Sequence, residues 1–124
     1  MEKVIQIFVL LTMAMVCAGC SSCDFDLVTG PYGVSDHALT ASSFHSHCPV
    51  PGVRMSSSNG WCPLSIGNGH YLQVEFQAIS ALKAIQTRGR ANANQWVTSY
   101  RVNTSKDGIT WSSVLNSTGH IKVT

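Results

Sequence analysis

Strict alternation of apolar and polar residues at positions 71–76 constrains the fold more than any other feature of the sequence. In this stretch (YLQVEF), Leu72, Val74 and Phe76 share one face of an extended chain, with polar residues between them. A period of two is the signature of a half-buried β-strand. Residues 96–104 alternate in the same way, which predicts a second strand with Trp96, Tyr100 and Val102 on its inner face.

Shorter signals complete an all-β pattern. Residues 38–42 (ALTAS) predict a short strand, and residues 81–87 predict another, although ALKAI also fits a helical fragment. Asp107-Gly108 between alternating runs predicts a hairpin that returns through residues 109–111. Residues 44–69 are rich in Pro, Ser, Gly and His and read as long surface loops. Strands at this spacing, with no amphipathic helix of normal length, indicate a sandwich or barrel.

The N-terminus reads as an export signal. Lys3 precedes an almost wholly apolar run over residues 4–16, and small residues follow at Ala18 and Gly19. We therefore expect residues 1–18 to form a signal peptide, with cuts after Gly19 or Cys20 as alternatives. A membrane anchor would need roughly 20 apolar residues, and a lipoprotein signal would need a large aliphatic residue where Cys17 stands. The sequence predicts a secreted protein.

Secretion makes disulfides the default state of the remaining cysteines. Cys48 and Cys62 flank a loop rich in Pro, Ser and Gly, and their pairing would remove about 3 kcal/mol of loop entropy from the unfolded chain. Cys23 is then left without a partner, unless Cys20 survives cleavage or the partner lies beyond Thr124.

Composition and motifs argue against several functions. A chain of 124 residues with 11% charged residues and a net charge of +2 has room for one modest domain and no basic surface typical of nucleic-acid binding. No nucleophile elbow, paired carboxylates or phosphate cradle is present, so we expect neither an enzyme nor a cofactor. We expect no metal site either. The spacing of the candidate ligands fits no standard zinc pattern, and oxidised cysteines cannot be ligands. These candidates are His45, His47, Cys48, Cys62 and His70.

Five segments in order resemble the discoidin domain family, also called the coagulation factor V/VIII type C family: LTASS (39–43), YLQVEF (71–76), IQTRGR (85–90), WVTSYRV (96–102) and SKDGITW (105–111). The resemblance extends over residues 23–124 and implies a jelly-roll β-sandwich of the galactose-binding-like type. It also implies a closing disulfide, with Cys23 at the position of its first cysteine. The family pattern is still running at Thr124, so we expect an incomplete domain that lacks its last strands and the closing cysteine.

The family's members are extracellular modules that bind carbohydrate, matrix proteins or anionic phospholipid through loops at one end. Here the resemblance places the binding mouth at residues 44–51, 56–60 and 88–95, and Arg90 is suited either to grip a carboxylate, sulfate or phosphate or to pair within the domain. Trp96 could stack on a sugar ring, but we expect it to lie in the core, as we expect for Trp61 and Trp111. The candidate ligand-binding residues are His45, His47, Val50, Ser57, Asn59, Arg88, Arg90, Asn92 and Asn94.

The sequence therefore predicts a non-catalytic module for adhesion or lectin-like binding of carbohydrate or matrix glycoprotein. Peripheral binding to anionic membranes is the alternative, with Val50 and Met55 as the available apolar tips. A secreted hydrolase is a distant third. Asn103 and Asn116 begin glycosylation motifs, and Asn116 is favoured because it falls in a predicted loop.

Overall fold

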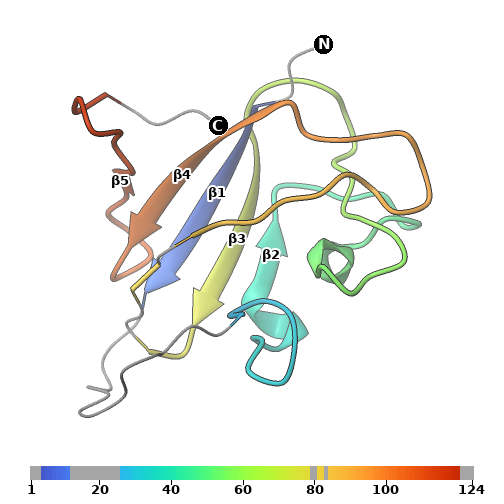
Figure 1. Ribbon diagram of the computed structural model, residues 1–124, viewed down its shortest axis with the longest axis horizontal. Coiled ribbons are helices and arrows are strands. Elements are labelled where there is room, and N and C mark those ends of the chain that lie inside the picture. The colour runs from blue at the N-terminus through green and yellow to red at the C-terminus, as the bar shows by residue number, and fades with distance from the viewer. Residues whose placement is uncertain (1–3, 12–25, 79–80, 83, 121–124) are drawn as a thin grey trace.

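A computed structural model of the chain shows one five-stranded sheet and describes residues 4–11, 26–78, 81–82 and 84–120 (Figure 1). Its elements are β1 (Val4–Leu11), β2 (Leu39–Ala41), β3 (His70–Phe76), β4 (Ser99–Ser105), β5 (Ser112–Ser113) and the 3-10 turns η1 (Asp36–Ala38) and η2 (Val50–Val53). The strands and turns of these residues include no α-helix, which confirms the all-β prediction. Within the same residues, no helix is long and apolar enough to cross a membrane.

The strand order is β2-β3-β1-β4-β5, so the N-terminal segment lies at the centre of the sheet. β1 runs parallel to β3, from Ile5 opposite His70 to Leu11 opposite Phe76. It also runs parallel to β4, and it is the link between the two strands. The sequence predicts that this segment is an export signal, and that remains a prediction. The structure adds that the backbone of this segment is extended and lies between β3 and β4.

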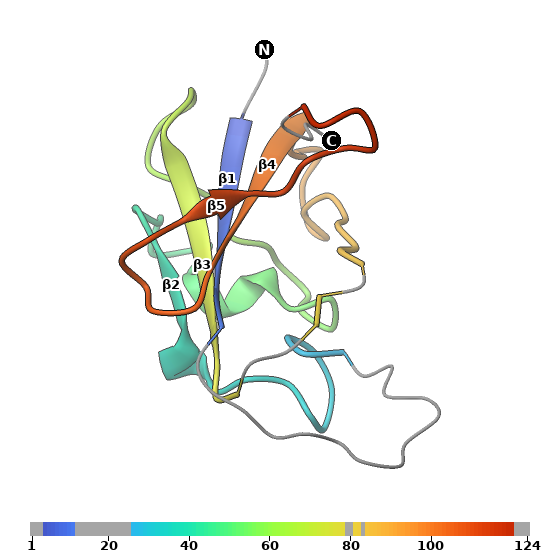
Figure 2. The same ribbon diagram turned by 90° about the vertical axis from the view of Figure 1, so that its left-hand side faces the viewer.

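The core lies on one face of the sheet. Val74 and Phe76 of β3 are buried while Glu75 between them is exposed, as the alternation predicts. On β4, Tyr100 and Val102 are buried around an exposed Arg101. Figure 2 shows the sheet nearly edge-on, with η2 and the loop that follows it to one side. From this loop region, Trp61 packs against the buried residues of both strands.

Two strand predictions are wrong, one because no strand forms and the other in its position. Residues 81–82 and 84–87 form no strand; Leu82 and Ile85 instead reach the core from irregular backbone and pack against Tyr100 and Val102. The hairpin after β4 exists, but its return strand is at Ser112–Ser113 rather than at 109–111. The reason is that the Asp107 carboxylate accepts hydrogen bonds from the backbone N–H groups of Ile109 and Thr110, which belong to the turn.

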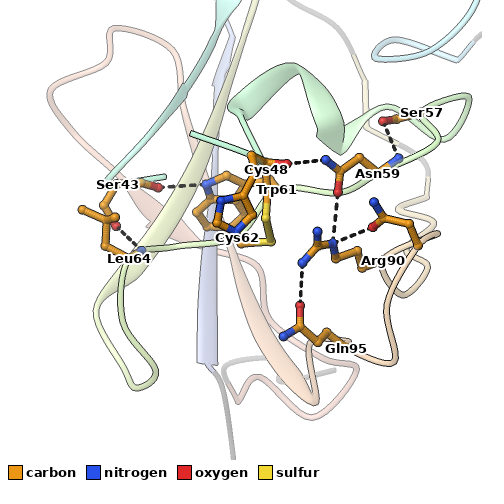
Figure 3. Close-up of a disulfide and its surroundings, with 11 residues drawn as sticks. Ser43, Cys48, Ser57, Asn59, Trp61, Cys62, Leu64, Arg90 and Gln95 are labelled. Atoms are coloured by element: carbon orange, nitrogen blue, oxygen red, sulfur yellow. Dashed lines mark hydrogen bonds between the residues drawn. A yellow bond between two sulfur atoms is a disulfide. The ribbon is translucent and has the colours of Figure 1, made fainter. Parts of the chain in front are cut away.

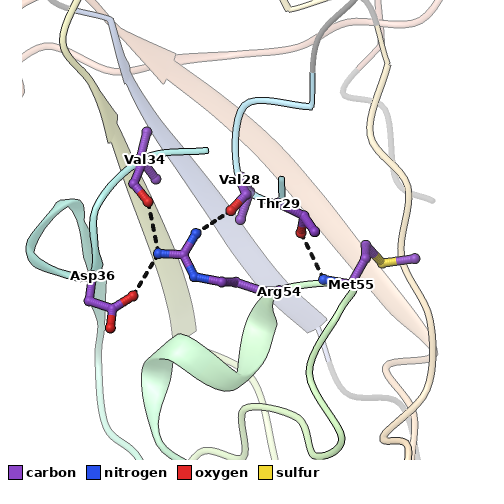
Figure 4. A network of polar contacts seen from close by, with 6 residues as sticks. All are labelled: Val28, Thr29, Val34, Asp36, Arg54 and Met55. Carbon is purple, nitrogen blue, oxygen red and sulfur yellow. Dashed lines mark hydrogen bonds and ion pairs between the residues drawn. The ribbon is translucent and has the colours of Figure 1, made fainter. Parts of the chain in front are cut away.

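Arg54 fixes the irregular segment that precedes β2 (Figure 4). Its guanidinium donates hydrogen bonds to the carbonyl oxygens of Val28 and Val34, and it forms an ion pair with Asp36 at 2.6 Å. The neighbouring Met55 N–H donates to the Thr29 hydroxyl at 2.8 Å. Residues 28–36 are thus tied to the end of η2. Cys17, Cys20 and Cys23 lie outside the described residues.

Candidate ligand-binding site

The predicted disulfide between Cys48 and Cys62 is present and closes the first loop (Figure 3). The two Cα atoms are 5.3 Å apart, and Cys48 is fully buried. Backbone hydrogen bonds run beside the bridge, from His45 N to Cys62 O at 3.0 Å and from Cys62 N to Cys48 O at 3.3 Å. The covalent bond and the hydrogen bonds together hold the two ends of the loop side by side.

Asn59 joins the three predicted loops into one surface. Its side-chain nitrogen donates to the carbonyl oxygen of His47, and its Oδ1 accepts from Arg90 Nε at 3.0 Å. Its backbone carbonyl accepts from the N–H of Ala91 at 3.2 Å. Residues 44–51, 56–60 and 88–95 therefore meet, and we call this region the loop end.

Arg90 is held by neutral amides rather than by an acid. Its Nε donates to the side-chain oxygens of Asn59 and Asn92, the latter at 2.7 Å, and its Nη1 donates to Gln95 Oε1 at 3.0 Å. Of the two roles left open by the sequence, the structure shows pairing within the domain. Because none of these acceptors is charged, the positive charge of the guanidinium is not neutralised by them.

Glycine permits the closest contacts of the loop end. A Cβ atom on Gly52 would lie 2.5 Å from the carbonyl oxygen of Gly60, too close for any side chain. A Cβ on Gly60 would lie 3.3 Å from Cγ of Arg90. The backbones at Gly52 and Gly60 are therefore in direct contact, and the Arg90 side chain packs against Gly60.

Trp96 is a correction to the sequence analysis, because its side chain is 58% exposed rather than buried. The physical reason is that β4 begins only at Ser99, so the alternation does not carry Trp96 into the sheet. A hydrogen bond from Arg90 N to Gln95 O at 2.8 Å closes the turn directly before it. The Asn-Ala-Asn sequence at 92–94 is the turn signal that could have marked this strand boundary.

Val50 is a second correction. The sequence analysis treats it as an exposed tip, but it is 8% exposed and packs with Leu39, Val74 and Phe76, because η2 turns it toward the sheet. Met55 is half-buried. The exposed apolar side chains near the disulfide are instead Phe44, Leu64 and Ile66, which are 50 to 59% exposed. Figure 3 shows Leu64 and Arg90 on opposite sides of the bridge.

The remaining predicted residues lie around the same loops. The rings of His45 and His47 stack with centroids 5.1 Å apart. Arg88 Nη2 donates to the carbonyl oxygen of Ser57, and Asn94 is exposed in the turn at 91–94. The described part of the chain contains no group of three or more His, Cys, Asp or Glu residues placed to hold a metal ion.

The two glycosylation motifs differ in accessibility. Asn103 is 9% exposed on β4, where its Oδ1 accepts a hydrogen bond from Ser113 Oγ at 2.7 Å. Asn116 is exposed in a turn, and its Oδ1 accepts hydrogen bonds from the N–H and the hydroxyl of Thr118, the third residue of its motif.

Comparison with known proteins identifies similar chains. The model of the F5/8 type C domain matches residues 38–124. The chain is 29% identical over 62 residues to a Discoidin-1 chain of Dictyostelium discoideum, covering 50% of this chain and 24% of the relative. It is 30% identical over 80 residues to Neurexin-4 of Drosophila melanogaster, covering 64% of this chain and 6% of that one. Hemocytin of Bombyx mori is 30% identical over 105 residues, covering 79% of this chain and 3% of hemocytin. The chain thus spans a quarter or less of the length of each of these three relatives, and no solved structure matches it significantly.

Proposed function

The chain belongs to the F5/8 type C domain family, whose fold is a β-sandwich, and we propose that it is a secreted, non-catalytic recognition module that binds carbohydrate. Residues 1–18 would direct its export and be removed. The binding surface would be the loop end together with Trp96. One observation carries the proposal: an exposed tryptophan directly follows a turn whose polar side chains are fixed by Arg90.

The exposure of Trp96 favours a ligand that stacks. Tryptophan is usually well buried, so a side chain that is 58% exposed beside an ordered polar loop indicates a contact surface. The indole offers a flat apolar face and one N–H donor, which suits a partner with both apolar and polar edges. A sugar ring has C–H groups on its faces and hydroxyls at its rim.

Arg90 determines which polar groups face the ligand. A guanidinium has donors only, so the amide oxygens of Asn92 and Gln95 turn toward it. Their NH₂ groups remain as donors for an oxygen-rich ligand. Together with the positive charge of Arg90 and Arg88, this arrangement favours sugars that carry a carboxylate or sulfate.

Binding to anionic membranes is the second candidate, and a different group of residues supports it. Phe44, Leu64 and Ile66 are exposed apolar side chains, and the Leu64 N–H donates to the hydroxyl of Ser43, the residue before Phe44, at 3.1 Å. Exposed apolar side chains are what a peripheral membrane module inserts into the headgroup layer.

Glycan binding can be tested with matched aromatic variants. We expect Trp96→Ala to weaken binding to acidic glycans at least tenfold, as measured on a glycan panel and by titration. The control, Tyr32→Ala, removes another exposed aromatic side chain outside the loop end and should leave affinity unchanged. Equal losses in both variants would contradict the proposal.

Membrane binding needs a separate experiment. Vesicles containing phosphatidylserine would be sedimented with the wild type, with Leu64→Asp/Ile66→Asp and with the control Ile109→Asp, whose side chain is 85% exposed at the β4–β5 turn. If the double variant alone loses vesicle binding while no glycan is retained by the wild type, the membrane function replaces the carbohydrate one.

A further inference from the structure

The chain contains two Asn-Gly pairs, Asn59-Gly60 and Asn68-Gly69, and the fold places them in opposite surroundings. An asparagine can lose ammonia when the backbone nitrogen of the next residue attacks its side-chain Cγ and closes a five-membered ring. Glycine in the second position favours this attack, because it has no Cβ to hinder the approach and its backbone rotates freely. Whether a pair reacts in the folded protein therefore depends on how firmly the structure holds it.

Asn59 is held at both its side chain and its backbone. Its carboxamide donates to the carbonyl oxygen of His47 and accepts from Arg90 Nε, and its backbone carbonyl accepts from the N–H of Ala91 at 3.2 Å. Ring closure requires rotation about the Cα–C bond of the asparagine, and the planar peptide unit would carry this carbonyl away from Ala91. Gly60 is packed as well, since a Cβ there would lie 3.3 Å from Cγ of Arg90. Reaction at Asn59 therefore requires local opening of the loop end.

Asn68 is exposed in an irregular segment, residues 64–69, that leads into β3. Within the described part of the chain, no hydrogen bond involves its side chain or its backbone. Glycine stands on both sides, with φ of +139° at Gly67 and +91° at Gly69. A Cβ at either glycine would meet no other atom within 4 Å, so the backbone on both sides of Asn68 has room to rotate.

We infer that Asn68 is a site of spontaneous deamidation and that the contacts of the loop end protect Asn59 from the same reaction. The Gly69 nitrogen forms a bond to Cγ of Asn68, the bond from Cγ to Nδ2 breaks, and the amine leaves as ammonia with the proton that the Gly69 nitrogen gives up. Water, the co-reactant, then opens the imide at either carbonyl group and gives aspartate or isoaspartate. The inference does not depend on which ligand the loop end binds.

Both products change the segment between the disulfide and β3. A carboxylate replaces a neutral carboxamide, which lowers the net charge by one at two positions from the exposed Ile66. Isoaspartate also leads the main chain through the former side chain and so lengthens the backbone by one CH₂ group. We expect the effect to reach the start of β3, where Ser42 N donates to Tyr71 O at 3.0 Å and Tyr71 N donates to the Ser42 hydroxyl at 3.1 Å.

The test follows the secreted full chain during incubation in neutral buffer made with oxygen-18 water. Hydrolysis of the imide incorporates the heavy oxygen, so the mass identifies the reaction. Reduction followed by cleavage after Trp61 places the two pairs in separate peptides, which mass spectrometry scores independently. We expect Asn68 to react roughly tenfold faster than Asn59, because Asn59 must wait for local opening. A protease that cuts before aspartate should leave the isoaspartate fraction uncut.

Denatured protein and matched variants identify the cause of the difference. In urea, with the disulfide intact, the two pairs should react at similar rates. Asn68→Gln should remove the early product, because a glutamine must close a less favourable six-membered ring. Arg90→Ala frees the Asn59 carboxamide and should speed the reaction at Asn59, whereas Arg88→Ala leaves every contact of Asn59 in place and should not.

Three results would overturn the inference. The first is a folded protein in which Asn59 reacts as fast as Asn68 or faster. The second is a folded protein in which Asn68 stays intact, whether or not the denatured chain reacts. The third is an Arg90→Ala variant in which Asn59 remains as protected as in the wild type. Because mass reports the modification and glycan titration reports binding, failure of either proposal is seen without the other.

Discussion

The loop end and the β4–β5 turn are both polar, yet they differ in the range of their contacts. At the loop end, Asn59 forms hydrogen bonds with His47 and Arg90, which are 12 and 31 positions away. Local bonds from Arg90 to Asn92 and Gln95 add to these long-range ones. In the β4–β5 turn, Asp107 binds residues two or three positions away. The first region exists only when the whole domain is folded, whereas the second is specified by its own few residues. The proposed recognition surface is therefore a product of tertiary structure.

Among the variants that test this comparison, removal of the disulfide should cause the largest loss of stability. For Cys48→Ala/Cys62→Ala we expect a loss of about 3 kcal/mol in the free energy of unfolding, because the bridge spans 14 positions and restricts the unfolded chain. Urea unfolding would measure it, with Cys23→Ser as the control that keeps the bridge. An unchanged urea midpoint in the double variant would show that the hydrogen bonds alone define the loop.

Asn59→Ala should have the next largest effect. The variant leaves the Arg90 Nε with one fewer acceptor and removes the donor to His47, so we expect a loss of about 2 kcal/mol and faster hydrogen exchange at Ala91. Asn94→Ala, at an exposed position of the same turn, is the matched control and should stay close to the wild type. Equal losses for both variants would mean that Asn59 does not join the loops.

Glycosylation tests the difference in exposure between Asn116 and Asn103, and we expect it to change stability little. We expect a glycan on Asn116, which is exposed, and none on Asn103, which is buried on β4. In protein secreted from eukaryotic cells, Asn116→Gln should abolish the mass shift that glycosidase treatment produces. Asn103→Gln should leave that shift in place, and its disappearance would contradict the burial of Asn103.

The smallest expected effect is a pH dependence in the β4–β5 turn. Hydrogen bonds from the N–H groups of Thr110 and Ile109 lower the pKa of Asp107 from 3.8 to about 2. A carboxyl whose pKa is lower in the folded state stabilises it above pH 3.8, and this contribution is lost as the pH falls toward 2. The Tm difference between the wild type and Asp107→Asn should therefore shrink over this range, while Lys106→Gln leaves the acid limb unchanged. A difference that stays constant with pH would contradict this assignment.

The sequence predicts the parts of the fold that depend on local pattern. Alternation identifies β3 and the buried face of β4, and cysteine spacing identifies the disulfide. It fails at residues 81–87, where Leu82 and Ile85 fill the core without forming a strand. It also fails at Trp96 and Val50, because their exposure depends on where β4 begins and how η2 turns. The link from Asn59 to Arg90 spans 31 positions and leaves no local signal.

The close approach of Gly52 to Gly60 limits how this surface can acquire new specificities. Any side chain at Gly52 would push η2 away from the loop at 56–60, because its Cβ would stand 2.5 Å from the carbonyl oxygen of Gly60. Substitutions at exposed tips of the loops, such as Ser46, Ser58 and Asn94, leave the contact between the two glycines intact. A combinatorial library should therefore hold both glycines constant and randomise the tips, so that the molecule serves as a scaffold with a fixed frame and interchangeable contact residues.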